Sequence, residues 1–391
     1  MSDSTPCIPV GYAWSSPFVR WGGAIADFSS LDVGVAVTTS ALNTRGLEAA
    51  SFGSLVLGWT VPQPEIFYGA PTLAARIGAP NLTGPMVSQA CATGVAAVQS
   101  AVGRVEDDGS ILVVGIDRTS NAPHLVYGSS SRPGGAPITE DWLLDNFARD
   151  PWAGLPMIDT AEAVIREGGF SRQQVDDLVL LRHGQYETTQ SAQARLRYLV
   201  EISLNDRRNS ITIADDVGVR PTTAESLAAR SAVRLDGVHT SESQTFPADG
   251  CAGLVVTTRG RLTEFPGVRG VADILGIGWA RAEKGRMPKA PVPAAYRALE
   301  RAGLTMGDVQ LVVTHNPFAA NDLWFAQETS FPLERMNTYG CSLIYGHPQA
   351  PTAIRGIAEL IEALSVAGGG IGLFTGCAAG DTAGALVVRV E

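Results

Sequence analysis

One cysteine stands at the start of a run of small and apolar residues in the stretch Val87-Ser88-Gln89-Ala90-Cys91-Ala92-Thr93-Gly94-Val95-Ala96-Ala97-Val98-Gln99-Ser100. The run predicts a helix that has no polar face and is therefore buried. A cysteine at a helix N-terminus lies beside unpaired backbone N–H groups and the positive end of the dipole, which lower the thiol pKa and can stabilise an oxyanion. Cys91 is a candidate nucleophile, although a free cysteine is also a common buried apolar residue.

Short apolar runs and helical patterns alternate on both sides of this stretch, as in a covered and mostly parallel sheet. Expected strands lie at 54–58, 85–88, 111–115, 254–258, 309–314 and 384–390, and expected helices at 31–42, 73–77, 292–302 and 354–364. The last helix is expected to be amphipathic, with Arg355, Glu359 and Glu362 on its polar face. Strands, a reactive residue and a helix recur in the same order in both halves, which suggests a duplicated α/β unit.

The composition indicates a large, well-buried globular protein of two or three structural units, because 391 residues exceed one ordinary core. No run of about 18 apolar residues predicts a membrane span. The first residues lack the pattern of an export signal, so a cytoplasmic protein is expected. A net charge of −10 argues against nucleic acid as a partner. Five scattered cysteines without CxxC spacing predict neither a disulfide framework nor a metal site.

The composition changes between about residues 119 and 239, where segments become charged and rich in glutamine. We interpret this region as an insertion that lies over the core, with exposed helices at 171–177 and 187–197.

Three further groups follow buried strands or lie in glycine-bounded turns: His315, His347 and Cys377. Ligands of open α/β sheets bind at such turns. A thiol nucleophile needs a base, which an imidazole supplies near neutral pH, and a second thiol can move a proton to or from a carbon acid. Each residue also has a structural interpretation, as a turn residue, a strand-end cap or core packing. Structural or surface roles are expected for the remaining histidines and cysteines, which are His124, His183, His239, Cys7, Cys251 and Cys341.

Six motifs in order resemble the thiolase family nearly end to end. They are Ser16-Pro17-Phe18-Val19-Arg20-Trp21-Gly22-Gly23, Gln89-Ala90-Cys91-Ala92-Thr93-Gly94, Gly115-Ile116-Asp117-Arg118-Thr119-Ser120-Asn121-Ala122-Pro123-His124, His315-Asn316-Pro317-Phe318, Asn337-Thr338-Tyr339-Gly340 with Gly346-His347-Pro348, and the segment of Cys377. His315 stands where many thiolases carry asparagine, which moves the chain toward the sterol-carrier type.

The resemblance implies an α/β fold of two duplicated βαβαβαββ halves in layers of the order α-β-α-β-α. The halves are expected at 1–260 and 261–391, with the insertion inside the first. It also implies a homodimer or homotetramer, with a small accessory subunit as a further option.

The implied chemistry is coenzyme-A-dependent thiolysis of a 3-oxoacyl-CoA, or the reverse Claisen condensation. Coenzyme A and acyl-CoA are then substrates, and no permanently bound cofactor is expected. Cys91 takes the acyl group and His347 its proton, while Cys377 exchanges a proton with the substrate's α-carbon. His315 holds one oxyanion, and the N–H groups of Cys91 and Ala379 hold a second.

The resemblance places five more residues at the substrate, namely Arg220, Ser226, Thr245, Phe318 and Met157. Arg220 matches a nucleotide-contacting position, with Ser226 nearby. Pro156 and Phe246 stand where acetoacetyl-specific enzymes carry other residues, so we expect a substrate other than plain acetoacetyl-CoA.

The chain departs from the family pattern at three places. Gln349-Ala350-Pro351-Thr352 follows the histidine motif, so the next helix is expected to begin differently, while Ala379 and Asp381 stand where the family has glycine. A positive φ at residue 379 would put the oxyanion hole in doubt. These departures leave open an acyl-CoA-binding protein without turnover. A ketosynthase-like condensing enzyme also remains open, although Cys377 argues against it because that chemistry needs no second thiol.

Overall fold

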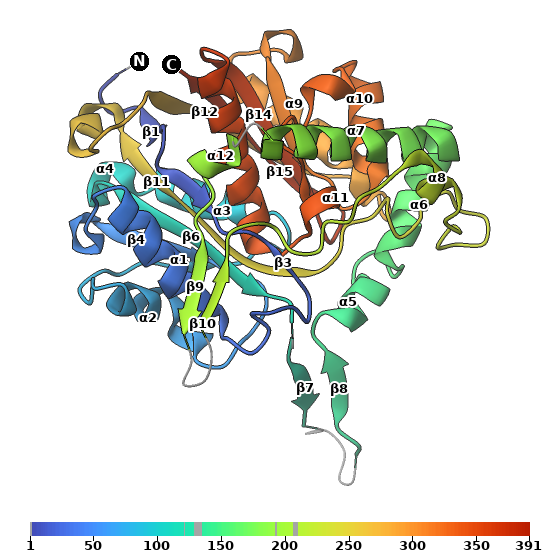
Figure 1. The fold of residues 1–391 in the computed structure, drawn as a ribbon, viewed down its shortest axis with the longest axis horizontal. Helices are drawn as coiled ribbons and strands as arrows, with labels where there is room; N and C mark the ends of the chain where they lie inside the picture. Colours follow the sequence, from blue (N-terminus) through green and yellow to red (C-terminus); the bar gives the residue numbers. More distant parts are fainter. Residues whose placement is uncertain (1, 121, 129–134, 192–193, 206–209) are drawn as a thin grey trace.

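The computed structural model describes residues 2–120, 122–128, 135–191, 194–205 and 210–391. Strands and helices alternate in the first part of the chain (Figure 1). These elements are β1 (Pro6–Pro9), β2 (Ala13–Ser15), β3 (Val19–Arg20), α1 (Ser30–Thr44), β4 (Ser54–Gly58), α2 (Gly69–Arg76), β5 (Met86–Val87), α3 (Thr93–Val102), α4 (Val105–Asp108), β6 (Ile111–Arg118) and, after a long excursion, β11 (Ala248–Thr258).

The second part repeats the pattern. Its elements are β12 (Val271–Arg281), α9 (Pro291–Ala302), β13 (Leu311–His315), α10 (Ala319–Thr329), α11 (Ser342–Tyr345), α12 (Ala350–Val366), β14 (Gly370–Ala378) and β15 (Thr382–Val390). A parallel bridge between Val312 and Met336 lies where the first part has β5. Each part therefore follows the predicted βαβαβαββ order.

The strands run in the order β13-β14-β15-β12-β1-β11-β6-β4-β5, with β2 and β3 also paired to β11. Parallel pairs lie toward the two ends, where β4 pairs with β5 and β6, and β13 pairs with β14. The central pairs are antiparallel, and β1 joins the two parts by pairing with both β11 and β12. The strand β12, which the sequence analysis did not predict, is needed for this continuous sheet.

Alternation along each strand creates the layers, because successive side chains point to opposite faces. In β4, Val56 faces a central core that contains α3 and α12, whereas Leu55 faces the core under α1 and α2. In β13, Val313 faces the same central core and Val312 faces the core under α9. The order of layers is therefore helix, sheet, paired central helices, sheet, helix, as predicted.

The central helix α12 corrects one expectation. Arg355 and Glu359 have no exposed surface and Glu362 is 1% exposed, so α12 is buried on all sides and the predicted polar face does not exist. The charges balance one another inside the protein: Arg355 contacts Asp216 at 2.7 Å and Glu359 at 2.9 Å. A buried charge is tolerated when it is paired in this way, and hydropathy alone cannot distinguish that case from a solvated face.

The excursion between β6 and β11 covers the end of the molecule where the active-site candidates lie. Its elements are β7 (His124–Tyr127), β8 (Ile138–Asp141), α5 (Leu144–Ala148), α6 (Met157–Gly168), α7 (Arg172–Ser191), β9 (Ile202–Asn205), β10 (Ser210–Ile213) and α8 (Ala224–Ala228). The β7–β8 hairpin projects away from the remainder (Figure 1). The two exposed helices expected at 171–177 and 187–197 are in fact the single helix α7 and a short turn at 194–197. Both are partly buried, since Arg182 in α7 and Arg195 in the turn are each at most 3% exposed. Among the described residues, no helix is both long and apolar enough to cross a membrane.

Candidate active site

Cys91 lies in the turn between β5 and α3, two residues before the helix begins. The preceding Ala90 has a φ of +45°, which is strained for a residue with a side chain and is a frequent sign of a functional turn. The hydroxyl of Thr93 fixes this turn by donating to the Ala90 carbonyl at 2.6 Å and accepting from the Gln89 N–H at 2.7 Å. The cysteine side chain remains partly accessible.

The protein around Cys91 raises the pKa of its thiol to about 12, chiefly by desolvation. Backbone N–H groups of Ala379 and of Cys91 itself act in the opposite direction, because they hydrogen-bond the sulfur and favour the thiolate. The predicted lowering by the helix N-terminus is therefore outweighed, and the resting residue is a neutral thiol.

His315 ends β13 and His347 precedes α12, and their rings stack at 4.0 Å between centroids. Each Nδ1 is held by a hydroxyl, that of Ser342 at 2.8 Å and that of Thr352 at 2.7 Å. Each Nε2 is buried without a hydrogen-bond partner among the described residues. One ring nitrogen of each histidine and the sulfur of Cys91 lie within 4.8 Å of one another.

Burial lowers the pKa of both imidazoles, that of His347 to about 3. Both rings are therefore neutral near pH 7, with a proton on one nitrogen of each. A ring whose Nδ1–H donates to its hydroxyl can accept a proton at Nε2, and a ring whose Nδ1 accepts from its hydroxyl can donate from Nε2. A catalytic zinc ion is held by three protein ligands, and the sulfur of Cys91 with one nitrogen each of His315 and His347 would supply that number. Metal ligation requires a thiolate, which the raised pKa of Cys91 opposes.

Cys377 lies near the end of β14 with no exposed surface. Its sulfur accepts a hydrogen bond from Asn321 Nδ2 at 3.2 Å, and burial raises the pKa of its thiol. The side chain belongs to an apolar cluster with Phe318, against which Met157 packs. The proximity of Cys91 raises the pKa of Cys377 further.

The two departures after Cys377 fit their backbone positions. Ala379 does not have a positive φ, so its methyl group causes no strain and its N–H still points at the Cys91 sulfur. Asp381 does have a φ of +57°, and its carboxylate accepts hydrogen bonds from the N–H groups of Gly285 at 2.8 Å and Arg286 at 3.0 Å. These bonds compensate for the strained conformation.

Two residues of the site were not predicted as functional. Asp117 is buried in β6 and accepts the N–H groups of Thr60, Val61 and Ala350, so it caps the N-terminus of α12. Burial raises its pKa to about 7 despite these bonds. Gln349 places Oε1 3.3 Å from the Cys91 sulfur. In the sequence, Asp117 could have been recognised from its position near the end of a buried strand. Gln349 could have been recognised from the unusual residues that follow His347.

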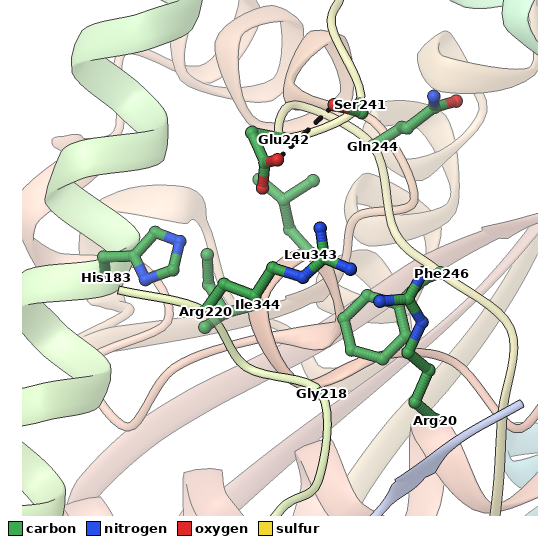
Figure 2. Close-up of a pocket in the computed structure, with 10 residues that line it drawn as sticks. All are labelled: Arg20, His183, Gly218, Arg220, Ser241, Glu242, Gln244, Phe246, Leu343 and Ile344. Atoms are coloured by element: carbon green, nitrogen blue, oxygen red, sulfur yellow. Dashed lines mark hydrogen bonds between the residues drawn. The ribbon is translucent and has the colours of Figure 1, made fainter. Parts of the chain in front are cut away.

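A cavity of about 90 Å³ lies near this centre, although its lining includes none of the four candidate catalytic residues. Arg20 and Arg220 line it, with the ring of Phe246 as its apolar wall (Figure 2). Phe246 is tied to the centre because its carbonyl accepts the N–H of His347 at 2.9 Å. Thr245 follows Gln244 and precedes Phe246 in the sequence, and both of these neighbours line the cavity. The hydroxyl of Thr245 donates to the Ser342 carbonyl at 2.5 Å.

The structure does not bring Ser226 into this cavity. Its hydroxyl is engaged in the N-terminal cap of α8, where it bonds with Thr223. Of the histidines given structural or surface roles, His124 is exposed, His239 is buried against Glu162, and His183 is a buried residue that lines the cavity.

Two family models match the chain: "Thiolase, N-terminal domain" over residues 10–260 and "Thiolase, C-terminal domain" over residues 268–390. The acetyl-CoA acetyltransferase of Rhizobium meliloti is 25% identical, with 99% of each chain covered. The 3-ketoacyl-CoA thiolase of Salmonella paratyphi B is 28% identical, with 96% of this chain and 95% of that protein covered.

Solved structures confirm the predicted fold. The acetyl-CoA acetyltransferase of Bacillus anthracis has a TM-score of 0.91 at 24% identity, with complete coverage of both chains. Human mitochondrial 3-ketoacyl-CoA thiolase in complex with CoA has a TM-score of 0.90 at 23% identity, again with complete coverage. Together the two family models span nearly the whole sequence, and the chain belongs to the thiolase family of acyltransferases.

Proposed function

We propose that this protein is a coenzyme-A-dependent acyltransferase that cleaves a 3-oxoacyl-CoA, or forms one in reverse, through an acyl group on Cys91. The observation that carries the proposal is the convergence of the Cys91 sulfur with one ring nitrogen of each of two neutral histidines within 4.8 Å. The relatives named as acetyl-CoA acetyltransferases and 3-ketoacyl-CoA thiolases support the reaction class.

In the cleavage direction, His347 takes the proton of the Cys91 thiol as the sulfur attacks the 3-oxo carbon. An oxyanion forms, stabilised by the N–H groups of Cys91 and Ala379, which already converge on the sulfur. The bond between carbons 2 and 3 then breaks, its electron pair becomes an enolate, and Cys377 protonates carbon 2. His315 stabilises the enolate oxygen, for which its unpaired Nε2 is the available group.

The second half-reaction releases the acyl group. The Cys377 thiolate takes the proton of coenzyme A, whose sulfur attacks the acyl carbon on Cys91. The Cys91 sulfur leaves and recovers its proton from His347, so both residues return to their starting states. Splitting one difficult carbon–carbon cleavage into two acyl transfers lowers the barrier of each.

Arg220 is proposed to bind the phosphates of coenzyme A at the mouth of the cavity, with Arg20 as a second cation there. The relative crystallised with CoA supports a CoA site in this fold. Thr245, Phe318 and Met157 are proposed to line the thioester and acyl chain. Ser226 is proposed near the nucleotide, with its hydroxyl engaged in the cap of α8.

A substrate other than plain acetoacetyl-CoA is proposed because Phe246 lines the cavity and Pro156 directly precedes α6. We also propose a homo-oligomer that is at least a dimer, since β5 is an edge strand of the large sheet with its side chains only partly buried. Unpaired edges of this kind favour pairing with a second chain.

The test is to mix the protein with a panel of 3-oxoacyl-CoA substrates and free coenzyme A. Mass spectrometry follows acylation of Cys91, and absorbance follows thiolysis. We expect an acyl adduct on Cys91 and turnover, with both lost in Cys91→Ala. Cys377→Ala is expected to accept an acyl group from a simple acyl-CoA but not to cleave the panel. Correctly folded protein that binds acyl-CoA without an adduct contradicts the proposal and identifies a binding protein.

A further inference from the structure

Gln349 has an unusual conformation for its surroundings. Its φ is +67° and its ψ −108°, a combination that costs energy for any residue with a side chain. The residue nevertheless precedes α12 directly and is only 5% exposed. Backbone strain of this kind persists when the surrounding structure holds the residue in place. The side chain therefore has a defined position rather than a solvated one.

That position lies against the nucleophile. The amide oxygen of Gln349 is 3.3 Å from the sulfur of Cys91, which donates its S–H to it. The same side chain raises the pKa of His347, two residues earlier in the chain, against the stronger effect of burial. A hydrogen bond to the S–H stabilises the protonated form of a thiol and fixes the direction of its proton.

We propose that Gln349 is a positioning residue that holds the S–H of Cys91, so that the resting thiol gives up its proton less readily than burial alone would make it. This role rests on the proposed function only in naming Cys91 as the nucleophile. Transfer of the proton to His347 then requires the S–H to leave the Gln349 oxygen, so the amide separates the resting state from the reacting one. The other titratable groups around the sulfur are His315, His347, Cys377 and Asp117.

The test measures the rate at which iodoacetamide alkylates Cys91 in the free protein at pH 8, by peptide mass spectrometry. Cys91 is the one partly accessible cysteine, since the other four are buried. Gln349→Met keeps the length of the side chain and removes the acceptor. We expect alkylation about fivefold faster, the factor that one neutral hydrogen bond is worth. Gln349→Glu adds a negative charge beside the sulfur and is expected to slow alkylation below the wild-type rate.

An unchanged or slower rate in Gln349→Met, or an unchanged rate in Gln349→Glu, overturns the proposal. Gln349→Gly is the control for backbone strain. It relieves the strain and also removes the acceptor, so alkylation is expected to accelerate as it does in Gln349→Met. A rate that rises in Gln349→Gly but not in Gln349→Met assigns the effect to the backbone and overturns the proposal. Because the assay contains no acyl-CoA, its failure leaves the proposed acyl transfer untouched, and absence of thiolysis in the wild type leaves this inference untouched.

Discussion

Replacing Arg355 by methionine is expected to destabilise the protein strongly, although the residue touches no substrate. Its guanidinium joins α12 to the segment between β10 and α8 by donating two hydrogen bonds to Asp216, at 2.7 and 2.9 Å. Within α12 it donates a third hydrogen bond to Glu359 at 2.9 Å. It also lies 3.6 Å from the ring centroid of Tyr345. The variant leaves two carboxylates buried without their main cation.

Removing one partner of a buried ion pair costs about 3–5 kcal/mol of unfolding free energy, because the remaining charge stays desolvated. The lower part of that range applies here. Asp216 keeps Arg195 at 3.2 Å, and Glu359 keeps the hydroxyls of Tyr198 and Tyr345. We therefore expect a loss of about 3 kcal/mol.

Urea unfolding at pH 7 measures this loss. The control is Arg104→Met, which removes an exposed helix pair with Asp108 and should cost less than about 0.5 kcal/mol. The double variant Arg355→Met with Glu359→Gln should regain part of the stability, because it removes one of the stranded charges. A loss in Arg355→Met no larger than in the control would refute the reasoning.

The remaining predictions concern the active centre. Burial lowers the pKa of His347 to about 3, so the imidazole stays neutral as the pH falls. The single-turnover acylation rate of Cys91 should therefore show no decline with a midpoint near pH 6.5, and such a decline would contradict the assignment. Asp381→Ala keeps the positive φ and strands the Gly285 and Arg286 N–H groups, so thermal unfolding should show a loss of about 2 kcal/mol. Asparagine adopts a positive φ readily and retains an acceptor oxygen, so Asp381→Asn should lose less stability than Asp381→Ala. An equal loss of unfolding free energy in the two variants would argue against this explanation.

The sequence predicted several strands of the sheet, because apolar runs bounded by glycine and turn residues are local signals, although it missed β12. The strand expected at 54–58 has those bounds in the structure, and the helix expected at 31–42 is α1. It predicted α12 at 354–364 but misjudged its polar residues. Arg355 and Glu359 are paired with residues of the insertion, and such long-range partners leave no trace in the periodicity. The division of the chain at residue 260 stays a prediction.

The candidate site was predictable where motifs carry it. Strand ends and glycine turns predict Cys91, His315, His347 and Cys377, and in the structure the first three converge within 4.8 Å. The protonation states were not predictable, because they depend on desolvation by the assembled fold. The helix terminus suggested an acidic thiol at Cys91, whereas burial makes it a weak acid. Gln349 was missed as a contact of the thiol because its reach to Cys91 depends on the positive φ of the residue before α12.

The pairing of α3 with α12 in the central layer has a consequence for how the chemistry is divided along the chain. Cys91 comes from the first repeat, while His315, His347 and Cys377 come from the second. A single repeat therefore carries a nucleophile without a base or a base without its nucleophile. Only the packing of the two repeats against each other assembles a complete site, so a substitution that loosens the α3–α12 contact separates the nucleophile from its base without altering either residue.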